Sequence, residues 1–257
     1  MLRTRVIPAL LLRDQSLVKT VRFGKFSYVG DPCNTVRIFN ELEVDELMLL
    51  DIAATRQGRE PDFTLLADIA NECFMPVAYG GGITSVAHAK AILKIGFEKV
   101  VVNSQALDRP EFIRELAAEL GSQAVVASVD VKRNLLGQPK VYRHAAQRTT
   151  GLDPIDWALL LQEQGAGEML LTCVDREGTW DGLDVDIVRS IAGKLRIPLI
   201  AHGGAGTIAS VAEAVKQGGA SAVAVGSMVV FQQKGMGVLV NFPAPGELEA
   251  ALGAAHS

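Results

Sequence analysis

The chain has 257 residues, of which 49% are hydrophobic and 21% are charged, and its formal net charge is −4. This length and apolar content allow a large buried core. No long run of basic residues suggests a nucleic-acid partner, and no apolar run approaches the roughly 18 residues of a membrane span. The three cysteines, Cys33, Cys73 and Cys173, match no metal or redox spacing.

The first residues of the chain lead directly into an apolar strand-like run, without a small-residue cleavage site. We therefore expect a cytoplasmic protein whose cysteines are reduced packing residues. No metal and no cofactor is expected from the sequence.

Eight short apolar runs, rich in β-branched residues or leucine, predict strands that are buried on both faces. In chain order they are Val6–Leu12, Glu46–Ile52, Pro76–Tyr79, Lys99–Asn103, Ala124–Asp130, Glu168–Val174, Pro198–His202 and Ala220–Val225. Amphipathic stretches between them, such as Val86–Ile95 and Pro110–Leu120, predict helices. Eight strand–helix units favour a closed (β/α)8 TIM barrel over an open doubly wound sheet, since no Gly-x-Gly-x-x-Gly follows the first strand.

An internal repeat is the strongest structural signal in the chain. Residues 76–87 resemble residues 198–212, and each segment is followed by a predicted helix and then by a predicted strand. The offset is about 122 residues, much longer than the repeats of solenoid proteins. The sequence therefore predicts one barrel domain over residues 1–257, built from half-barrels at about 1–121 and 122–240, with a tail at 241–257.

Each half carries glycines after its third strand and a small polar residue after its fourth. These positions are Gly81, Gly82, Asn103 and Ser104 in the first half, and Gly203, Gly204, Gly226 and Ser227 in the second. Glycine lets the backbone approach an anion, and N–H groups at a helix N-terminus then point at it. We expect two phosphate sites on opposite sides of the barrel mouth; the alternative is that the glycines serve only tight turns.

Polar residues at strand ends should lie between the two phosphate sites. Asp130 ends an apolar run, and a carboxylate there can act as a general acid or base once burial raises its pKa. The alternative is a structural ion pair with Lys132. Asp51, Thr172 and Asp175 occupy similar positions, where they could bind substrate or cap loops.

These motifs, with the stretches Asp130–Arg133, Asp175–Thr179 and Gly203–Gly206, resemble the cyclase subunit of imidazole glycerol phosphate synthase. The resemblance covers roughly residues 1–232. It implies Asp130 and Thr172 as catalytic residues, and a substrate site that includes Lys19, Asp51, Asp175 and, at the second phosphate, Gly178.

The resemblance also implies a partner, a class I glutaminase that forms a heterodimer and releases ammonia at the N-terminal end of the barrel. The family guards the ammonia entrance with four charged residues. They match Arg5, Glu46, Lys99 and Glu168 in this chain. A stabilising ring of ion pairs without a conduit is the alternative.

The chain departs from the family pattern at one catalytic position. The family uses two aspartates as general acid and base, and the first of them falls on Leu11, which cannot transfer a proton. Asp14 lies beyond the strand end and is a poor substitute. Ala9 replaces the family's usual cysteine, and Gly235, Gly237 and Pro243 make the segment after Phe231 unsuited to the family's terminal helix.

These departures resemble paralogues associated with bacterial surface polysaccharides. In those systems the barrel and its glutaminase are expected to supply ammonia to an ATP-dependent amidotransferase that makes an acetamidino sugar. Two alternatives remain. One is a functional histidine-pathway cyclase that makes imidazole glycerol phosphate and the aminoimidazole carboxamide ribotide. The other is a sugar-phosphate isomerase, which the four charged residues disfavour.

Overall fold

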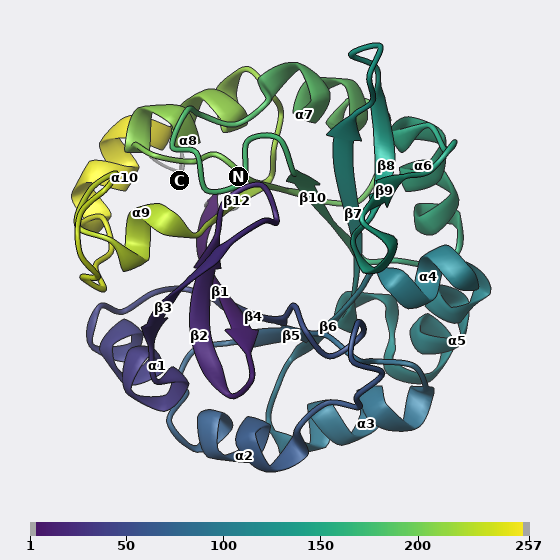
Figure 1. Cartoon of the computed structure of the whole chain (residues 1–257), viewed down its shortest axis with the longest axis horizontal. Helices are drawn as coiled ribbons and strands as arrows, with labels where there is room; N and C mark the ends of the chain where they lie inside the picture. The colour runs from purple at the N-terminus through teal and green to yellow at the C-terminus, as the bar shows by residue number, and fades with distance from the viewer. Residues whose placement is uncertain (1–3, 254–257) are drawn as a thin grey trace.

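The computed structural model describes residues 4–253, so the last four residues of the predicted tail lie outside the described residues. Eight parallel strands form a closed barrel, because β12 pairs with β1 and β10 pairs with β7. In spatial order they are β1 (Arg5–Arg13), β4 (Leu47–Asp51), β5 (Val77–Gly80), β6 (Lys99–Val102), β7 (Val125–Arg133), β10 (Glu168–Cys173), β11 (Leu199–His202) and β12 (Ala222–Val225). Figure 1 shows helices surrounding this ring of strands. The predicted (β/α)8 TIM barrel is confirmed.

The helices of the outer layer are α1 (Pro32–Glu41), α2 (Phe63–Asn71), α3 (Val86–Ile95), α5 (Glu111–Leu120), α6 (Pro154–Glu163), α7 (Val185–Ala192), α8 (Ile208–Lys216) and α10 (Pro245–Leu252). Most of them begin at side chains that accept backbone N–H groups, including Asp31, Ser85, Asp153 and Thr207, whereas α5 and α10 have no such cap. The short helices α4 (Ser104–Asp108) and α9 (Ser227–Val230) follow β6 and β12 directly. Among the described helices, none is long and apolar enough to span a membrane.

Two hairpin extensions were not predicted from the sequence. Strand β1 continues into an antiparallel pairing with β2 (Ser16–Thr20), which pairs with β3 (Phe26–Gly30). In the second half, β7 pairs with β8 (Pro139–Arg143), which pairs with β9 (Arg148–Thr149). Both extensions lie beyond the C-terminal ends of barrel strands. Two 3-10 turns complete the set, at Ser122–Ala124 and His144–Ala146.

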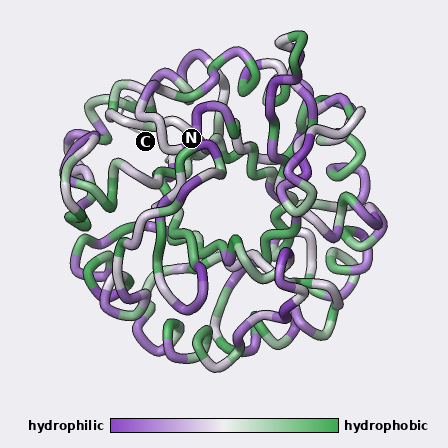
Figure 2. Tube along the Cα trace, in the orientation of Figure 1, coloured by the Kyte–Doolittle hydropathy of each residue, from purple (hydrophilic) through white to green (hydrophobic). Residues whose placement is uncertain are grey.

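The barrel has two hydrophobic cores, because successive side chains of a strand point to opposite faces. The larger core lies between strands and helices. The smaller core fills the inside of the barrel and consists of Ile7, Ala9, Met48, Ala78, Val101, Val126, Leu170, Ile200, Ala222 and Ala224. Figure 2 shows hydrophobic positions recurring around the inner ring of strands.

The two halves share backbone geometry at their glycine loops. A Cβ added to Gly81 would lie 2.6 Å from the carbonyl oxygen of Asp51, and one added to Gly203 would lie 2.6 Å from that of Cys173. The helices that follow begin at residues of nearly identical backbone conformation, with φ −143° and ψ 156° in one half and φ −146° and ψ 159° in the other. The sequence repeat therefore corresponds to a repeated local structure on opposite sides of the barrel.

Residues 231–244 are not helical. Phe231 forms an isolated bridge with Val238, and Gly235 adopts a φ of +82°, a backbone conformation that favours glycine. Gly235, Gly237 and Pro243, the poor helix residues singled out in the sequence, all lie in this non-helical stretch. The helix α10, which packs against α8 at the end of the described chain, was not predicted.

Candidate functional site

A ring of four charged side chains closes the N-terminal end of the barrel. Arg5 Nη1 lies 2.5 Å from Glu46 Oε2, and Arg5 Nη2 lies 2.9 Å from Glu168 Oε1. Lys99 Nζ completes the ring, at 2.9 Å from Glu46 Oε1 and 3.1 Å from Glu168 Oε2. Burial lowers the pKa of Arg5, but Glu168 and Glu46 raise it by more. The structure therefore brings together all four residues that the sequence grouped, and each one contacts two residues of opposite charge.

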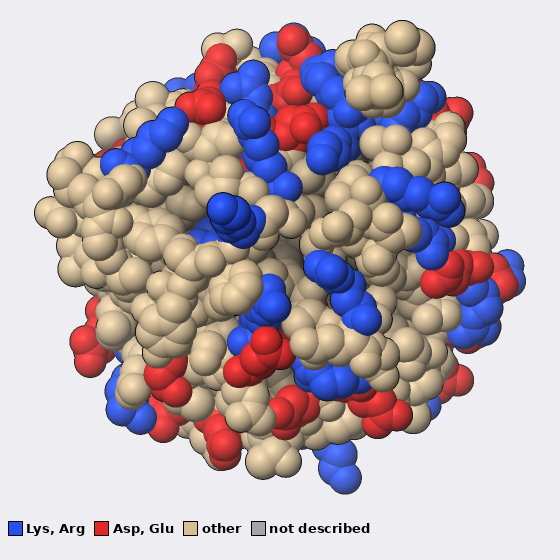
Figure 3. Space-filling view, viewed as in Figure 1, with Lys and Arg blue, Asp and Glu red and all other residues tan. Residues whose placement is uncertain are grey.

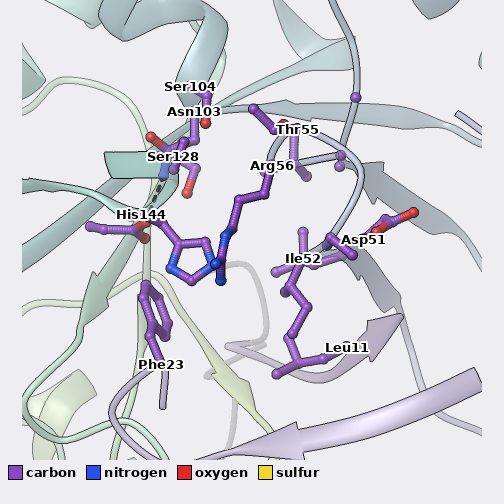
Figure 4. A pocket seen from close by; sticks show the side chains of 18 of the residues that line it. Leu11, Phe23, Asp51, Ile52, Thr55, Arg56, Asn103, Ser104, Ser128 and His144 are labelled. Atoms are coloured by element: carbon purple, nitrogen blue, oxygen red, sulfur yellow. Dashed lines mark hydrogen bonds between the residues drawn. The ribbon is translucent and has the colours of Figure 1, made fainter. Parts of the chain in front are cut away.

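At the opposite, C-terminal end, a cavity of about 340 Å³ opens between the strand ends and the loops that follow them. Its lining joins the first predicted phosphate loop to the predicted catalytic centre, and includes Leu11, Asp51, Gly81, Gly82, Asn103, Ser104, Asp130 and Thr172. Figure 4 shows Leu11 on one wall of this cavity, with Asn103, Ser104 and Ser128 on another and Arg56 and His144 between them. A cavity of this size accommodates a small organic molecule.

Asp130 is buried inside the cavity wall and is 6% exposed. Its Oδ2 accepts a hydrogen bond of 2.9 Å from Asn103 Nδ2. Burial raises the pKa of Asp130 to about 7, although hydrogen bonds from Asn103 and Thr172 act to lower it, and Glu177 raises it further. A carboxyl group with this pKa can hold or release a proton near neutral pH, as general acid–base chemistry requires.

The alternative partner for Asp130 does not contact it in the described structure. Lys132 Nζ lies 5.2 Å from the centre of the Tyr142 ring, and no ion pair joins Lys132 to Asp130 among residues 4–253. The neighbours of Asp130 are therefore neutral groups: the Asn103 amide, which donates a hydrogen bond to it, and Thr172, which lies beside it in the strand register.

Thr172 lies beside Asp130 in the register of β7 and β10, and beside His202 in the register of β10 and β11. Its Oγ1 is 3.1 Å from His202 Nδ1. His202 is 5% exposed, and burial together with the nearby charge of Lys19 lowers the pKa of its imidazole to about 3. His202 is thus a neutral imidazole at physiological pH. Its site role was missed by sequence reasoning, although its place at a strand end directly before a predicted phosphate loop was a usable signal.

A second, smaller cavity lies at the other glycine loop. It is lined by Lys19, Glu177, Gly178, His202, Gly203, Gly204, Ala205, Ala224, Gly226 and Ser227. Lys19 Nζ lies 3.7 Å from Glu177 Oε1, and burial lowers the pKa of Lys19 despite this contact. A Cβ on Gly226 would lie 2.4 Å from Lys19 Nζ, so the ammonium group lies directly against the loop. All of the residues predicted for the second phosphate loop therefore line one cavity with a lysine.

Glu177 organises the loops around this cavity and was also missed by the sequence. Its carboxylate accepts hydrogen bonds from Thr20 Oγ1 at 2.9 Å and from the Phe23 backbone N–H at 3.1 Å. It is 1% exposed. The β2–β3 loop is thereby fixed to the loop that follows β10.

The glycines of both loops are required by close backbone contacts. A Cβ on Gly82 would lie 2.6 Å from the Arg59 carbonyl oxygen, and a Cβ on Gly178 or Gly204 would lie 2.2 Å from a carbonyl oxygen. All three have positive φ, a conformation that side chains rarely adopt. Tight turns alone thus account for these glycines, and phosphate binding at the two loops stays a prediction.

Asp51 and Asp175 both accept hydrogen bonds from backbone N–H groups, Asp51 within its own loop and Asp175 from the end of β7. Asp51 Oδ1 accepts from the backbone N–H groups of Ala53 and Ala54, each at 2.9 Å, and Asp51 lines the large cavity. Asp175 accepts from the Arg133 backbone N–H at 2.8 Å and lines neither cavity. The structure therefore brings Asp51, but not Asp175, to a cavity.

Leu11 is 4% exposed and lies on the cavity wall, where it presents an apolar surface. Asp14, the alternative acid, pairs with Arg13 at 3.3 Å, accepts from Gln57 at 3.1 Å and is not a cavity residue. Asp130 and Asp51 are therefore the aspartates that line the large cavity, and Glu177 is its glutamate.

The mouth of the barrel carries many cations, although the whole chain is acidic. Figure 3 shows Lys and Arg side chains gathered around the hollow at the centre of this face. Arg13 and Arg56 belong to the lining of the large cavity. This arrangement attracts anionic ligands. No cluster of three His, Cys, Asp or Glu side chains suited to a metal occurs within residues 4–253.

The sequence of the chain is similar to those of several known proteins. The model of a family described as "Histidine biosynthesis protein" matches residues 5–234. A Pseudomonas aeruginosa protein provisionally named imidazole glycerol phosphate synthase subunit hisF2 is 46% identical over 249 residues, which cover 97% of this chain and 99% of that protein. A Vibrio vulnificus protein provisionally named subunit hisF3 is 44% identical, covering 98% and 97% of the two chains. A Leptospira borgpetersenii HisF protein, also provisionally named, is 42% identical, covering 97% and 99%.

Proposed function

Because the chain belongs to the histidine biosynthesis protein family, as a HisF-like imidazole glycerol phosphate synthase subunit, we propose that it is the synthase-type subunit of a glutamine amidotransferase complex. A class I glutaminase releases ammonia against the N-terminal end of the barrel. The ammonia passes the ring of Arg5, Glu46, Lys99 and Glu168, crosses the apolar interior, and reaches the cavity at the C-terminal end. Phosphate groups of a small-molecule ligand bind at the two glycine loops.

The observation that carries the proposal is the combination of a complete charged ring with an incomplete acid–base pair. The four ion pairs of the ring are intact at one end of the barrel. At the other end, Leu11 contributes an apolar wall to the cavity that contains Asp130. An enzyme that conducted ammonia and also cyclised its substrate would need proton transfer on both sides of the reacting atoms.

We therefore propose that this chain supplies ammonia to a separate acceptor enzyme, an ATP-dependent amidotransferase that converts an N-acetyl sugar to an acetamidino sugar. In this reading Asp130 and Thr172 are retained for binding and for proton transfer to ammonia. The chain acts in the cytoplasm as part of surface polysaccharide biosynthesis.

A second candidate is a functional cyclase of histidine biosynthesis. It is favoured by Asp130, whose pKa of about 7 suits acid–base catalysis. It requires a proton donor other than Leu11.

One assay separates the two candidates. The purified chain is given free ammonia and the phosphoribulosyl formimino substrate of the family's cyclase. Ammonia delivery predicts little or no cyclisation. Turnover at ordinary enzyme rates, on the order of 1 s⁻¹ or above, would refute ammonia delivery and support the histidine-pathway cyclase.

A further inference from the structure

A continuous polar row crosses the mouth of the barrel between the two glycine loops. Asn103 is the N-cap of α4 and belongs to the first loop, whereas His202 directly precedes Gly203 in the second. Asp130 and Thr172 lie between them on β7 and β10, in register with each other. The contacts run from Asn103 Nδ2 to Asp130 Oδ2 at 2.9 Å, and from Thr172 Oγ1 to His202 Nδ1 at 3.1 Å. Thr172 is the neighbour of Asp130 in this register, and its hydroxyl lowers the pKa of Asp130.

The hydrogen bonds of Thr172, in the middle of this row, can run in either of two directions, because its hydroxyl group donates only one hydrogen bond. If His202 carries its proton on Nδ1, it donates to Thr172, and Thr172 donates to an ionised Asp130. If Asp130 is protonated, it donates to Thr172, Thr172 donates to Nδ1 of His202, and the imidazole proton is on Nε2. The protonation of Asp130 and the tautomer of His202 are therefore linked through one hydroxyl group.

His202 also lines the small cavity beside Lys19. An imidazole with its proton on Nε2 can donate a hydrogen bond outward, while its Nδ1 accepts from Thr172. An anion in that cavity would favour the Nε2–H tautomer, because the other tautomer presents a lone pair.

We propose that His202 is a positioning residue that couples anion binding in the small cavity to the protonation of Asp130, through reversal of the Thr172 hydrogen bonds. Anion binding selects the Nε2–H tautomer, and this tautomer favours a protonated Asp130. The Nδ1–H bond of His202 breaks and an Nε2–H bond forms by proton exchange with solvent. The proton that Asp130 gains also comes from solvent, and the Thr172 hydroxyl keeps its own proton and only rotates. The coupling has two arms: the tautomer arm links His202 to Asp130, and the anion arm links anion binding to the tautomer of His202. The anion arm rests on the proposed phosphate site, whereas the tautomer arm does not.

The charged surroundings allow this switch. Burial of His202 and the positive charge of Lys19 keep its imidazole neutral, so that tautomerisation rather than protonation is the available change. Burial raises the pKa of Asp130 to about 7, which places its titration in an accessible range. The other titratable groups facing the row are Glu177, which interacts with both Lys19 and Asp130, and Tyr142, whose pKa is raised by burial and by Asp130.

The test is nitrogen NMR of the imidazole rings in the full-length chain. The chain has four histidines, so His202→Gln assigns the signal. Without ligand, the His202 tautomer should change from Nε2–H at pH 5 to Nδ1–H at pH 9, with a midpoint near the pKa of Asp130. Thr172→Val should abolish the change, and Thr172→Ser should preserve it. A tautomer independent of pH in the wild-type chain, or a change that persists in folded Thr172→Val, would overturn the proposal.

Inorganic phosphate tests the second arm. Amide shifts of Gly204 and Ser227 report binding itself, and the midpoint of the tautomer change should then move to higher pH in the wild-type chain. Binding without any movement of the midpoint would refute the coupling. Absence of amide shifts up to high phosphate concentration would instead refute the phosphate site, and with it the anion arm.

Discussion

The substitution Leu11→Asp should raise cyclase activity, which we expect to be little or none in the wild-type chain. Leu11 lines the same cavity as Asp130, so an aspartate there would add a second proton-transfer group to the centre. One positioned acid or base typically contributes about 10²–10⁴-fold, and we expect a gain at the lower end, about 10²-fold, because the cavity has not been shaped around this carboxylate.

The same substitution should cost stability. Leu11 is 4% exposed, and losing its burial removes about 2–3 kcal/mol. For a chain of this size, that loss lowers Tm by roughly 5–10 °C. Activity must therefore be measured well below the melting transition of the variant, with folding checked by circular dichroism.

The assay follows cyclisation of the phosphoribulosyl formimino substrate with free ammonia. Leu11→Asn is the matched control, because asparagine has the size of aspartate and removes the same buried leucine, but cannot transfer a proton. Adding Asp130→Asn to Leu11→Asp should remove the gain. The reasoning is refuted if Leu11→Asn gains as much as Leu11→Asp, or if the wild-type chain already turns over at about 1 s⁻¹.

Three further predictions concern the ring, the partner surface and pH. Lys99→Met should lower the free energy of unfolding by about 1–3 kcal/mol in denaturant titrations, because it leaves two glutamates of the ring with one cation. Lys99→Arg, which keeps the positive charge, should retain most of the wild-type stability. Equal stability of all three chains would contradict this prediction. Glu98→Lys, an exposed change beside the ring, should weaken binding to the glutaminase with altered salt dependence, whereas Glu60→Lys at the opposite end should not; equal affinities in calorimetry would place the interface elsewhere. Because the pKa of Asp130 is raised in the folded chain, its contribution to the free energy of unfolding falls as the pH rises from about 4 to 7. Because the pKa of His202 is lowered, its contribution rises as the pH rises from about 3 to 6.5. The two contributions therefore oppose each other in the wild-type chain. Relative to wild type, Asp130→Asn should therefore make stability rise more steeply between pH 4 and 6.5, and His202→Gln should make it fall; parallel pH profiles for the three chains would exclude these titrations.

The barrel itself was accessible from the sequence because buried parallel strands have a simple signature. All eight predicted runs became barrel strands, with ends that differ by at most a few residues. The two hairpin extensions were not predicted. They extend β1 and β7 past the barrel into partly exposed loops, where the apolar run that marks a buried strand stops.

The site was only partly accessible, for a physical reason. Strand-end position and the glycine repeat identified Asp130, Thr172 and the loops, since these are properties of single segments. Contacts between segments cannot be read in this way. Glu177 fixes a loop 154 positions away in sequence, and His202 meets Thr172 across two neighbouring strands.

The repeated architecture explains how one end of the barrel can diverge while the other stays complete. The charged ring depends on four residues at strand starts, and each of them contacts two others, so the loss of any one leaves a partly buried charge without one partner. Leu11 is under no such constraint, because an apolar side chain on the wall of an open cavity leaves no charge unpaired. A leucine at this position is therefore compatible with the fold. Replacing a charged residue of the ring by leucine would weaken the barrel whether or not ammonia passes through it. An intact ring is therefore expected both for an ammonia conduit and for a purely stabilising set of ion pairs.

Ammonia transfer separates these two roles of the ring. It is measured as glutamine-dependent activity of the acceptor enzyme, with Lys99→Met compared with Lys99→Arg at temperatures where both remain folded. A transfer defect confined to Lys99→Met, at equal folded fraction, supports the conduit, and equal transfer by both assigns the ring to stability.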